Sequence, residues 1–220
     1  MIIVHHLNDS RSQRVLWLLE ELGLDYEVRR YERDRQTMLA PPELRAIHPL
    51  GKSPVIEDGD VKVAETGAVI EYLLDTYGQG RLKPGPGTED ARRYTYWLHY
   101  AEGSAMTPLL LKLIFSRIPS QSPGLIRPIV KGVSKTVLGR MVDPQLKTHG
   151  DYWESELAAT GWFAGADFSA ADIMMSFPLE AAAARAGGAD RPQSEAFLKR
   201  IHARPAYQKA LERGGPYSYA

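Results

Sequence analysis

Residues 2–31, IIVHHLNDSRSQRVLWLLEELGLDYEVRRY, decide the fold. The β-branched, apolar run at 2–7 predicts a buried strand, and the run at 26–31 predicts a second one. Between them, apolar residues recur at helical spacing, at Val15, Leu18, Leu19 and Leu22. Gly23 then predicts the C-cap of that helix. A strand, a helix and a strand within about thirty residues form a βαβ unit, so we expect the two strands to be parallel.

The following elements complete a small mixed sheet. The runs PVIED (54–58) and VKVA (61–64) flank an Asp-Gly turn, which predicts an antiparallel hairpin. A short helical turn near 42–47 precedes the hairpin, and a helix from Glu65 to about Gly78 follows it. This order of elements predicts an α/β thioredoxin-like domain with a mixed four-stranded sheet.

A linker separates this domain from a helical one. Residues 79–88, QGRLKPGPGT, contain the run Pro-Gly-Pro-Gly, which breaks both helices and strands. Beyond the linker no segment alternates as a strand does, so we expect an all-α domain. Pro178 falls inside one of its helices and should bend it or lie where a kink is tolerated. The predicted domains are therefore 1–78 and 89–220.

Composition limits the chemistry. The 220 residues include 27 Lys+Arg and 27 Asp+Glu, and 44% are hydrophobic, which is an ordinary globular balance. Without a global basic excess, nucleic acid is not an expected partner. The absence of cysteine from the sequence excludes disulfides, Cys-rich zinc sites, iron–sulfur clusters and a cysteine nucleophile. A reactive thiol would have to arrive with a ligand.

The zero net charge hides an asymmetry between the two halves. Residues 1–78 hold 9 basic and 14 acidic residues, and the remainder holds 18 and 13. Basic side chains concentrate between 112 and 147, where a solvated helix face is one interpretation and attraction of anions to a pocket is another. No apolar run reaches the ~20 residues that span a bilayer, and the N-terminus does not resemble a signal peptide. We expect no membrane partner and a cytoplasmic location.

The loop at 8–12 is the first candidate site, because it joins a strand to a helix N-terminus. Backbone N–H groups and the helix dipole favour an anion there. A hydroxyl in the loop could donate to a thiolate and lower the thiol pKa from its usual value of about 8.5. The structural alternative is that Ser10 or Ser12 only caps the helix.

Two further segments carry candidate binding residues. Lys52, Ser53 and Pro54 precede a predicted strand, and a cis bond before the proline would leave the Ser53 backbone free to pair with an extended ligand. An ordinary trans turn is the more frequent alternative. Glu65 and Thr66 begin a helix, where a hydroxyl and a carboxylate suit an amino-acid head group. A simple N-cap is the alternative.

Ser169 and Asp172 have the spacing of a capping box before an apolar run, which favours a structural role. The six histidines show no metal-ligand spacing, so we expect no metal site.

Four segments, SRSQRVLWLLEELGLDYEV, HPLGKSP, AETGAVIEYL and SAADIMMSFPL, together resemble the soluble glutathione S-transferase family over essentially the whole chain. With YAEGS, the pattern is most similar to a branch shared by yeast-type and bacterial enzymes. The resemblance implies a glutathione transferase fold and a homodimer. It also implies that glutathione is the co-substrate of a small hydrophobic electrophile.

The resemblance also assigns residues to the glutathione site. By position, Ser53 and Pro54 match the segment that pairs with the cysteinyl part of glutathione. Glu65 and Thr66 match the pair that holds its γ-glutamyl end, and Lys52 lies where a side chain often approaches the glycyl carboxylate. Ser169 and Asp172 match the family's capping box.

The activating residue and the second pocket are assigned on the same basis. Ser10 is expected to hydrogen-bond the thiolate, with Asn8, Arg11 and Ser12 as rivals. The electrophile is expected near the helix around 100–115, with Met106, Leu109 and Leu113 as its lining. A plain core role is the alternative for these three.

The expected activity is conjugation of the glutathione sulfur to an electrophile. A glutathione-dependent peroxidase would use the same thiolate against hydroperoxides. A non-enzymatic glutathione-binding or regulatory protein on the same scaffold is the third hypothesis.

Overall fold

A mixed four-stranded sheet forms the N-terminal domain of the computed structural model, which describes residues 1–34, 36–37, 39–186 and 190–219. Its strands are β1 (Ile2–Leu7), β2 (Tyr26–Tyr31), β3 (Val55–Asp58) and β4 (Val61–Ala64), in the spatial order β2-β1-β3-β4. β1 and β2 are parallel, whereas β3 pairs antiparallel with both β1 and β4. The predicted βαβ unit, hairpin and fold class are confirmed.

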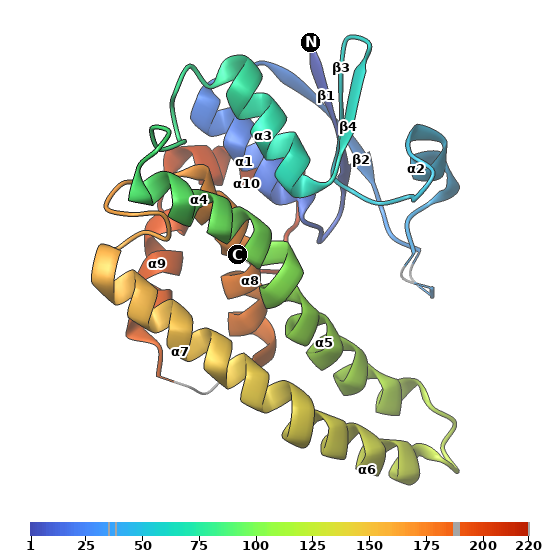
Figure 1. Cartoon of the computed structure of the whole chain (residues 1–220). Coiled ribbons are helices and arrows are strands. Elements are labelled where there is room, and N and C mark those ends of the chain that lie inside the picture. Colours follow the sequence, from blue (N-terminus) through green and yellow to red (C-terminus); the bar gives the residue numbers. More distant parts are fainter. Residues whose placement is uncertain (35, 38, 187–189, 220) are drawn as a thin grey trace.

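Helices cover this sheet on the side that faces the rest of the chain (Figure 1). α1 (Ser12–Leu22) ends at Gly23, whose φ of 67° is left-handed, as the C-cap prediction requires. α3 (Thr66–Tyr77) packs beside α1, and α2 (Pro42–Ile47) lies apart from both. α10 (Pro205–Gly214) returns from the end of the chain to pack on α1 and β2. A helix from the predicted second domain therefore completes the first.

The remaining helices include two long rods, each made of two α-helices joined end to end through a π-helical turn. The first rod is α4 (Glu89–Tyr100), the π-helical turn η1 (Ala101–Ala105) and α5 (Met106–Gln121). The second is α6 (Arg127–Val137), the π-helical turn η2 (Leu138–Val142) and α7 (Asp143–Thr160). α5 and α6 project from the body as an arm, and α8 (Ala170–Ala186) lies inside it (Figure 1). α9 (Pro192–His202) packs against α7 at the edge of the body. Among the described residues beyond 88, no strand occurs.

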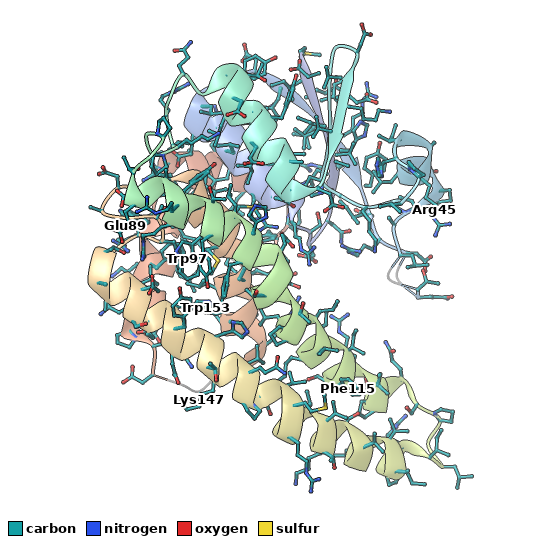
Figure 2. All side chains as sticks on the ribbon, viewed as in Figure 1. Arg45, Glu89, Trp97, Phe115, Lys147 and Trp153 are labelled. Atoms are coloured by element: carbon teal, nitrogen blue, oxygen red, sulfur yellow. The ribbon has the colours of Figure 1, made fainter. Side chains whose placement is uncertain are left out.

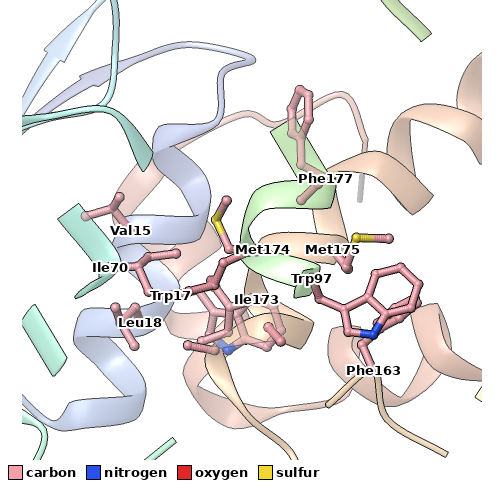
Figure 3. Packing of buried hydrophobic residues seen from close by; sticks show 14 of the residues in the cluster. Val15, Trp17, Leu18, Ile70, Trp97, Phe163, Ile173, Met174, Met175 and Phe177 are labelled. Atoms are coloured by element: carbon pink, nitrogen blue, oxygen red, sulfur yellow. The ribbon is translucent and has the colours of Figure 1, made fainter. Parts of the chain in front are cut away.

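The core is continuous from the sheet domain into the helices. α8 runs through its centre, and Ile173, Met174 and Met175 are fully buried. Trp97 of α4 stacks on Tyr152 with 5.3 Å between the ring centroids, and the centroids of the Trp97 and Phe163 rings are 4.6 Å apart. Figure 2 labels Trp97, and Figure 3 shows Trp97 and Phe163 packed together, where each large ring removes much apolar area from water.

In the described part of the chain, no helix is long and apolar enough to cross a membrane.

Candidate active site

The hydroxyls of the loop at 8–12 point into the protein. Ser10 and Ser12 are buried, and their Oγ atoms lie 2.7 Å apart. The Ser12 N–H donates to Ser10 Oγ at 3.3 Å, and Ser12 Oγ lies 2.8 Å from Nδ1 of His6. The three side chains form one hydrogen-bonded chain from the start of α1 back to β1.

The direction of these hydrogen bonds follows from the protonation state of His6. Burial, followed by the charge of Arg30, lowers the pKa of His6 to about 4, so its ring is neutral near pH 7. The ring also hydrogen-bonds to the backbone of Gly214. A carbonyl there takes the imidazole N–H, which leaves Nδ1 as the acceptor for Ser12. Ser12 then accepts from Ser10, so the hydrogen of the Ser10 hydroxyl is directed inward.

Asn8 and Asp9 fix the path of the same loop. Oδ1 of Asn8 accepts from the backbone N–H of Arg33 at 2.9 Å. Asp9 has a left-handed φ of 47°, a conformation that Asp tolerates better than most residues, and its Oδ1 accepts from the N–H of Ser218 at 2.8 Å. Both side chains thus accept hydrogen bonds from backbone N–H groups of segments that lie next to the loop.

Arg11 is the basic residue of this loop, and its side chain is partly exposed. The side chain is 37% exposed, and Nη1 lies 3.0 Å from Oε2 of Glu102 in η1. The charges of Glu102, Arg14, Glu65 and Arg185 all act on it. Arg11 therefore stands where the start of α1, the start of α3 and the helical domain meet.

Arg14 connects the same segments from beneath. It is 1% exposed, and its guanidinium pairs with Oε1 of Glu102 and donates to Oγ1 of Thr66 at 3.4 Å. Nη1 also donates to the carbonyl of Met174 at 2.7 Å. That carbonyl lies four residues before Pro178, which has no N–H to offer it. Arg14 thereby satisfies the acceptor that the proline leaves open, which is how α8 tolerates Pro178.

Glu102 is held ionised between the two arginines. Burial raises the pKa of its carboxyl, but the charges of Arg14 and Arg11 outweigh burial, and the pKa is lowered. A carboxylate shared by two guanidinium groups fixes the position of both. The π-helical turn that carries Glu102 is an irregularity of the kind that often marks functional sites.

Ser53 joins the second segment to the loop. Its Oγ donates to the carbonyl of His5 at 2.8 Å and accepts from the N–H of Leu7 at 3.2 Å. The side chain thus supplies sheet-like hydrogen bonds beside Pro54, which has no N–H. The Ser53–Pro54 bond is cis, and Lys52 is exposed.

The third segment, at the start of α3, has a strained backbone. Glu65 is exposed and has φ 71° and ψ 128°, a combination uncommon for a residue with a side chain. Thr66 is buried beneath it. Such conformations cluster at ligand-binding sites, where surrounding structure maintains them. The three predicted segments therefore converge, because Ser53 contacts Leu7 just before the loop and Arg14 contacts Thr66.

The other predicted residues lie elsewhere. Met106 and Leu109 are buried in the core, and Leu113 is half-buried. Ser169 and Asp172 bond to each other at the start of α8: Asp172 Oδ2 accepts from the Ser169 N–H at 2.8 Å and from the Ser169 hydroxyl at 3.2 Å. Ser169 Oγ also accepts from the Ala171 N–H at 3.3 Å. Asp172 Oδ1 also accepts from the Phe163 N–H at 2.8 Å.

A cavity of about 520 Å³ lies within the helical domain, among α5, α7, α8 and α9. The predicted glutathione residues do not line it. Its three cations, Lys112, Lys147 and Arg191, are already paired with Asp143 or Asp151. Over the described ranges, no group of three His, Asp or Glu side chains is placed to hold a metal ion.

Comparisons with known proteins identify the family of the chain. A family model described as the glutathione S-transferase N-terminal domain matches residues 1–75. Glutathione S-transferase 1 of Saccharomyces cerevisiae is 34% identical, over 97% of this chain and 95% of that protein. Glutathione S-transferase 3 of Schizosaccharomyces pombe is 34% identical, over 83% of this chain and 74% of its own length.

A solved structure extends the likeness to three dimensions. A glutathione S-transferase from Actinobacillus pleuropneumoniae superposes with a TM-score of 0.79 at 34% identity, covering 97% of this chain and 93% of that one. The chain belongs to the glutathione S-transferase family.

Sequence reasoning missed Arg14, Glu102 and Pro178 as parts of the site. One signal was available, because a proline inside a helix leaves a carbonyl open four residues earlier. An arginine within the apolar spacing of α1 was a second signal. Neither shows which distant partner completes the contact.

Proposed function

We propose that this protein is a glutathione transferase that joins the glutathione sulfur to small hydrophobic electrophiles. The observation that carries the proposal is the convergence of three segments on one face of the first domain: the loop at 8–12, Ser53 with Pro54, and the strained Glu65 with Thr66. The names of the similar proteins support glutathione as the ligand.

Each segment would hold one part of glutathione. The Ser53 backbone would pair with the cysteinyl residue, and Glu65 with Thr66 would bind the γ-glutamyl ammonium and carboxylate. Lys52 would approach the glycyl carboxylate. No metal is part of this proposal.

For the thiolate, we favour Arg11 among the four candidates of the loop. The hydroxyls of Ser10 and Ser12 are engaged with each other and with His6, and Asn8 holds Arg33. The Arg11 side chain is partly exposed beside the N-terminus of α1, and the Glu102 carboxylate that pairs with it is shared with Arg14. The three groups therefore keep a net positive charge, which favours an anion together with the helix dipole. An opposite charge within a few ångströms lowers a thiol pKa.

In the reaction, the thiol proton leaves to solvent and the thiolate forms a carbon–sulfur bond with the electrophile. In a substitution, the leaving group departs with its electron pair. Holding the thiolate and the electrophile together removes the entropy cost of their encounter. The chain's contribution is therefore ionisation and placement.

The test is conjugation of chlorodinitrobenzene with glutathione by the purified protein. The proposal predicts a saturable rate above the uncatalysed one, and a rate equal to the uncatalysed one would contradict it. Cumene hydroperoxide in a parallel assay distinguishes a peroxidase, and glutathione binding without either activity would identify a non-enzymatic binding protein.

We also propose a domain division at 79–88, a cytoplasmic location and a homodimer. Leu110, Ile114 and Ile118 repeat every four residues along α5 and are exposed, which suits burial by a second copy. The acidic first half and the basic remainder are complementary if each meets the other across a two-fold axis.

The variant Ile114→Asp should shift sedimentation toward the monomer, because it places a charge in that apolar stripe. The variant Ser116→Asp, which adds a charge at an exposed site on another side of α5, is the control. Sedimentation of the wild type only as a monomer would contradict the dimer.

A further inference from the structure

The end of the chain lies against the loop at 8–12. After α10, residues 215–219 return to the junction between the two domains, where Figure 1 places the C-terminus beside α8. The backbone N–H of Ser218 donates to Oδ1 of Asp9 at 2.8 Å, two residues from Arg11. Tyr217 anchors the segment from below, since its hydroxyl donates to Oε2 of the buried Glu180 at 2.6 Å.

This anchoring places the ring of Tyr219 against α8. The Tyr219 and Phe177 ring centroids are 5.4 Å apart, in an edge-to-face arrangement. Arg185 donates to the Tyr219 hydroxyl at 2.6 Å, and its guanidinium carbon lies 5.3 Å from the ring centroid. The side chain is thus fixed by a ring contact and by a charged hydrogen bond.

Phe177 joins Tyr219 to the proposed thiolate site. The centroid of its ring lies 5.5 Å from the guanidinium carbon of Arg14 and 6.0 Å from that of Arg11. Figure 3 shows its side chain pointing away from the packed rings of Trp97 and Phe163. Its neighbours are therefore the site arginines on one side and Tyr219 on the other.

We propose that Tyr219 and Phe177 form the wall that receives the substituent on the glutathione sulfur, and that Tyr219 determines specificity for aromatic electrophiles. The Asp9–Ser218 hydrogen bond sets the position of this wall relative to Arg11. The proposal rests on the proposed transferase function and places the electrophile away from Met106 and Leu109, which are core residues.

The chemistry of the wall defines the ligand class. Phe177 is buried and supports the Tyr219 ring, which is half-buried and keeps an exposed part on which a flat ring can pack. Because the Tyr219 oxygen accepts from Arg185, its own hydrogen remains available for an acceptor such as a nitro or carbonyl oxygen. We therefore expect aryl substituents that carry an acceptor to bind more tightly than small alkyl ones.

Binding of S-conjugates tests the wall without requiring turnover. Calorimetry would compare S-(p-nitrobenzyl)glutathione with S-methylglutathione in the full-length protein. The variant Tyr219→Ala should weaken binding of the nitrobenzyl conjugate about tenfold and leave the methyl conjugate within about twofold, since one aromatic contact is lost. Tyr219→Phe, which keeps the ring, should lose only about threefold.

A matched pair tests the anchoring of the wall. Ser218→Pro removes the N–H that Asp9 accepts, whereas Ser218→Ala keeps it. The proline variant should resemble Tyr219→Ala in its selective loss of the nitrobenzyl conjugate, and the alanine variant should resemble the wild type.

Two results would overturn the proposal. If Tyr219→Ala binds both conjugates as tightly as the wild type, or weakens both equally, Tyr219 does not contact the substituent. Failure of the wild type to bind either conjugate would instead reject the proposed function, and the wall with it.

Discussion

The starts of α1 and α8 are built from similar sequence and differ in what they leave exposed. In both, a serine hydroxyl is buried and accepts a hydrogen bond from a backbone N–H of the helix that follows: Ser12 for Ser10, and Ala171 for Ser169. At α8 the neighbouring charge, Asp172, is fully buried and satisfied by local donors. At α1 the neighbouring charge, Arg11, remains partly exposed and faces Glu102 across the domain junction.

This difference shows what separates a structural helix start from a candidate site. The presence of a hydroxyl before a helix does not decide the matter, because both hydroxyls here serve the fold. A charge that is positioned by other groups but still reachable from solvent is the distinguishing feature. We therefore assign a structural role to the start of α8 and a role in binding the thiolate to the start of α1.

The largest expected effect lies at α8. Asp172→Ala leaves the N–H groups of Phe163 and Ser169 without their buried acceptor, so we expect a loss of about 3 kcal/mol in the free energy of unfolding. Chemical denaturation measures it. Asp167→Ala, at an exposed position nearby, should change stability by less than about 0.5 kcal/mol. Equal stabilities of the two variants would contradict the structural role assigned to Asp172 at the start of α8.

The next effect is in the pH dependence of stability. The folded pKa of His6, about 4, lies below the usual histidine pKa of 6.5, so its contribution to stability is present above pH 6.5 and is lost as the pH falls toward 4. The loss amounts to about 3 kcal/mol. Burial raises the pKa of Asp172 from 3.8 to about 6, so its contribution to stability has the opposite sign: it is present below pH 3.8 and is lost as the pH rises through 6.

Denaturation at several pH values separates the contributions of His6 and Asp172 to the free energy of unfolding. His6→Gln should flatten the loss between pH 6.5 and 4, and Asp172→Asn should steepen it. His99→Gln, at an exposed position, is the control. An unchanged slope in His6→Gln would mean that the ring is not buried in its neutral form.

The smallest effect concerns the hydroxyl of α1. Ser10→Ala removes the buried hydroxyl that accepts from the N–H of Ser12, the first residue of α1, which should lower the free energy of unfolding by about 1 kcal/mol. Ser169→Ala should show a loss of similar size, since the hydroxyls play similar parts. A Ser10→Ala variant of unchanged stability and abolished conjugation would return Ser10 to the catalytic role that the sequence favoured.

The sequence was sufficient for the sheet and for most helices. Periodicity and turn residues are local signals, so the parallel β1–β2 pair, the hairpin at 54–64 and the Gly23 cap could all be predicted. The π-helical turns could not, because the apolar spacing continues through them. The packing of α10 on α1 was also missed, since an apolar helix face does not name its partner.

The site was predictable in its segments and not in its contacts. Glu65 with Thr66 and Ser53 with Pro54 stand out as motifs, but the bond of Ser53 Oγ to β1 depends on strand register. The pairing of Arg14 with the Met174 carbonyl joins residues 160 positions apart. The inward direction of the Ser10 hydrogen depends on the protonation of His6, which burial in the fold determines.

The central claim is that Arg11, and not Ser10, stabilises the thiolate, and the pKa of enzyme-bound glutathione tests it most directly. Ultraviolet absorbance of the thiolate gives this pKa in the wild type, Arg11→Gln and Ser10→Ala. We predict a wild-type pKa below the free value of about 8.5. Arg11→Gln should raise it by about 1, because an adjacent positive charge is lost, and Ser10→Ala should leave it unchanged. A raised pKa in Ser10→Ala with an unchanged one in Arg11→Gln would contradict the account.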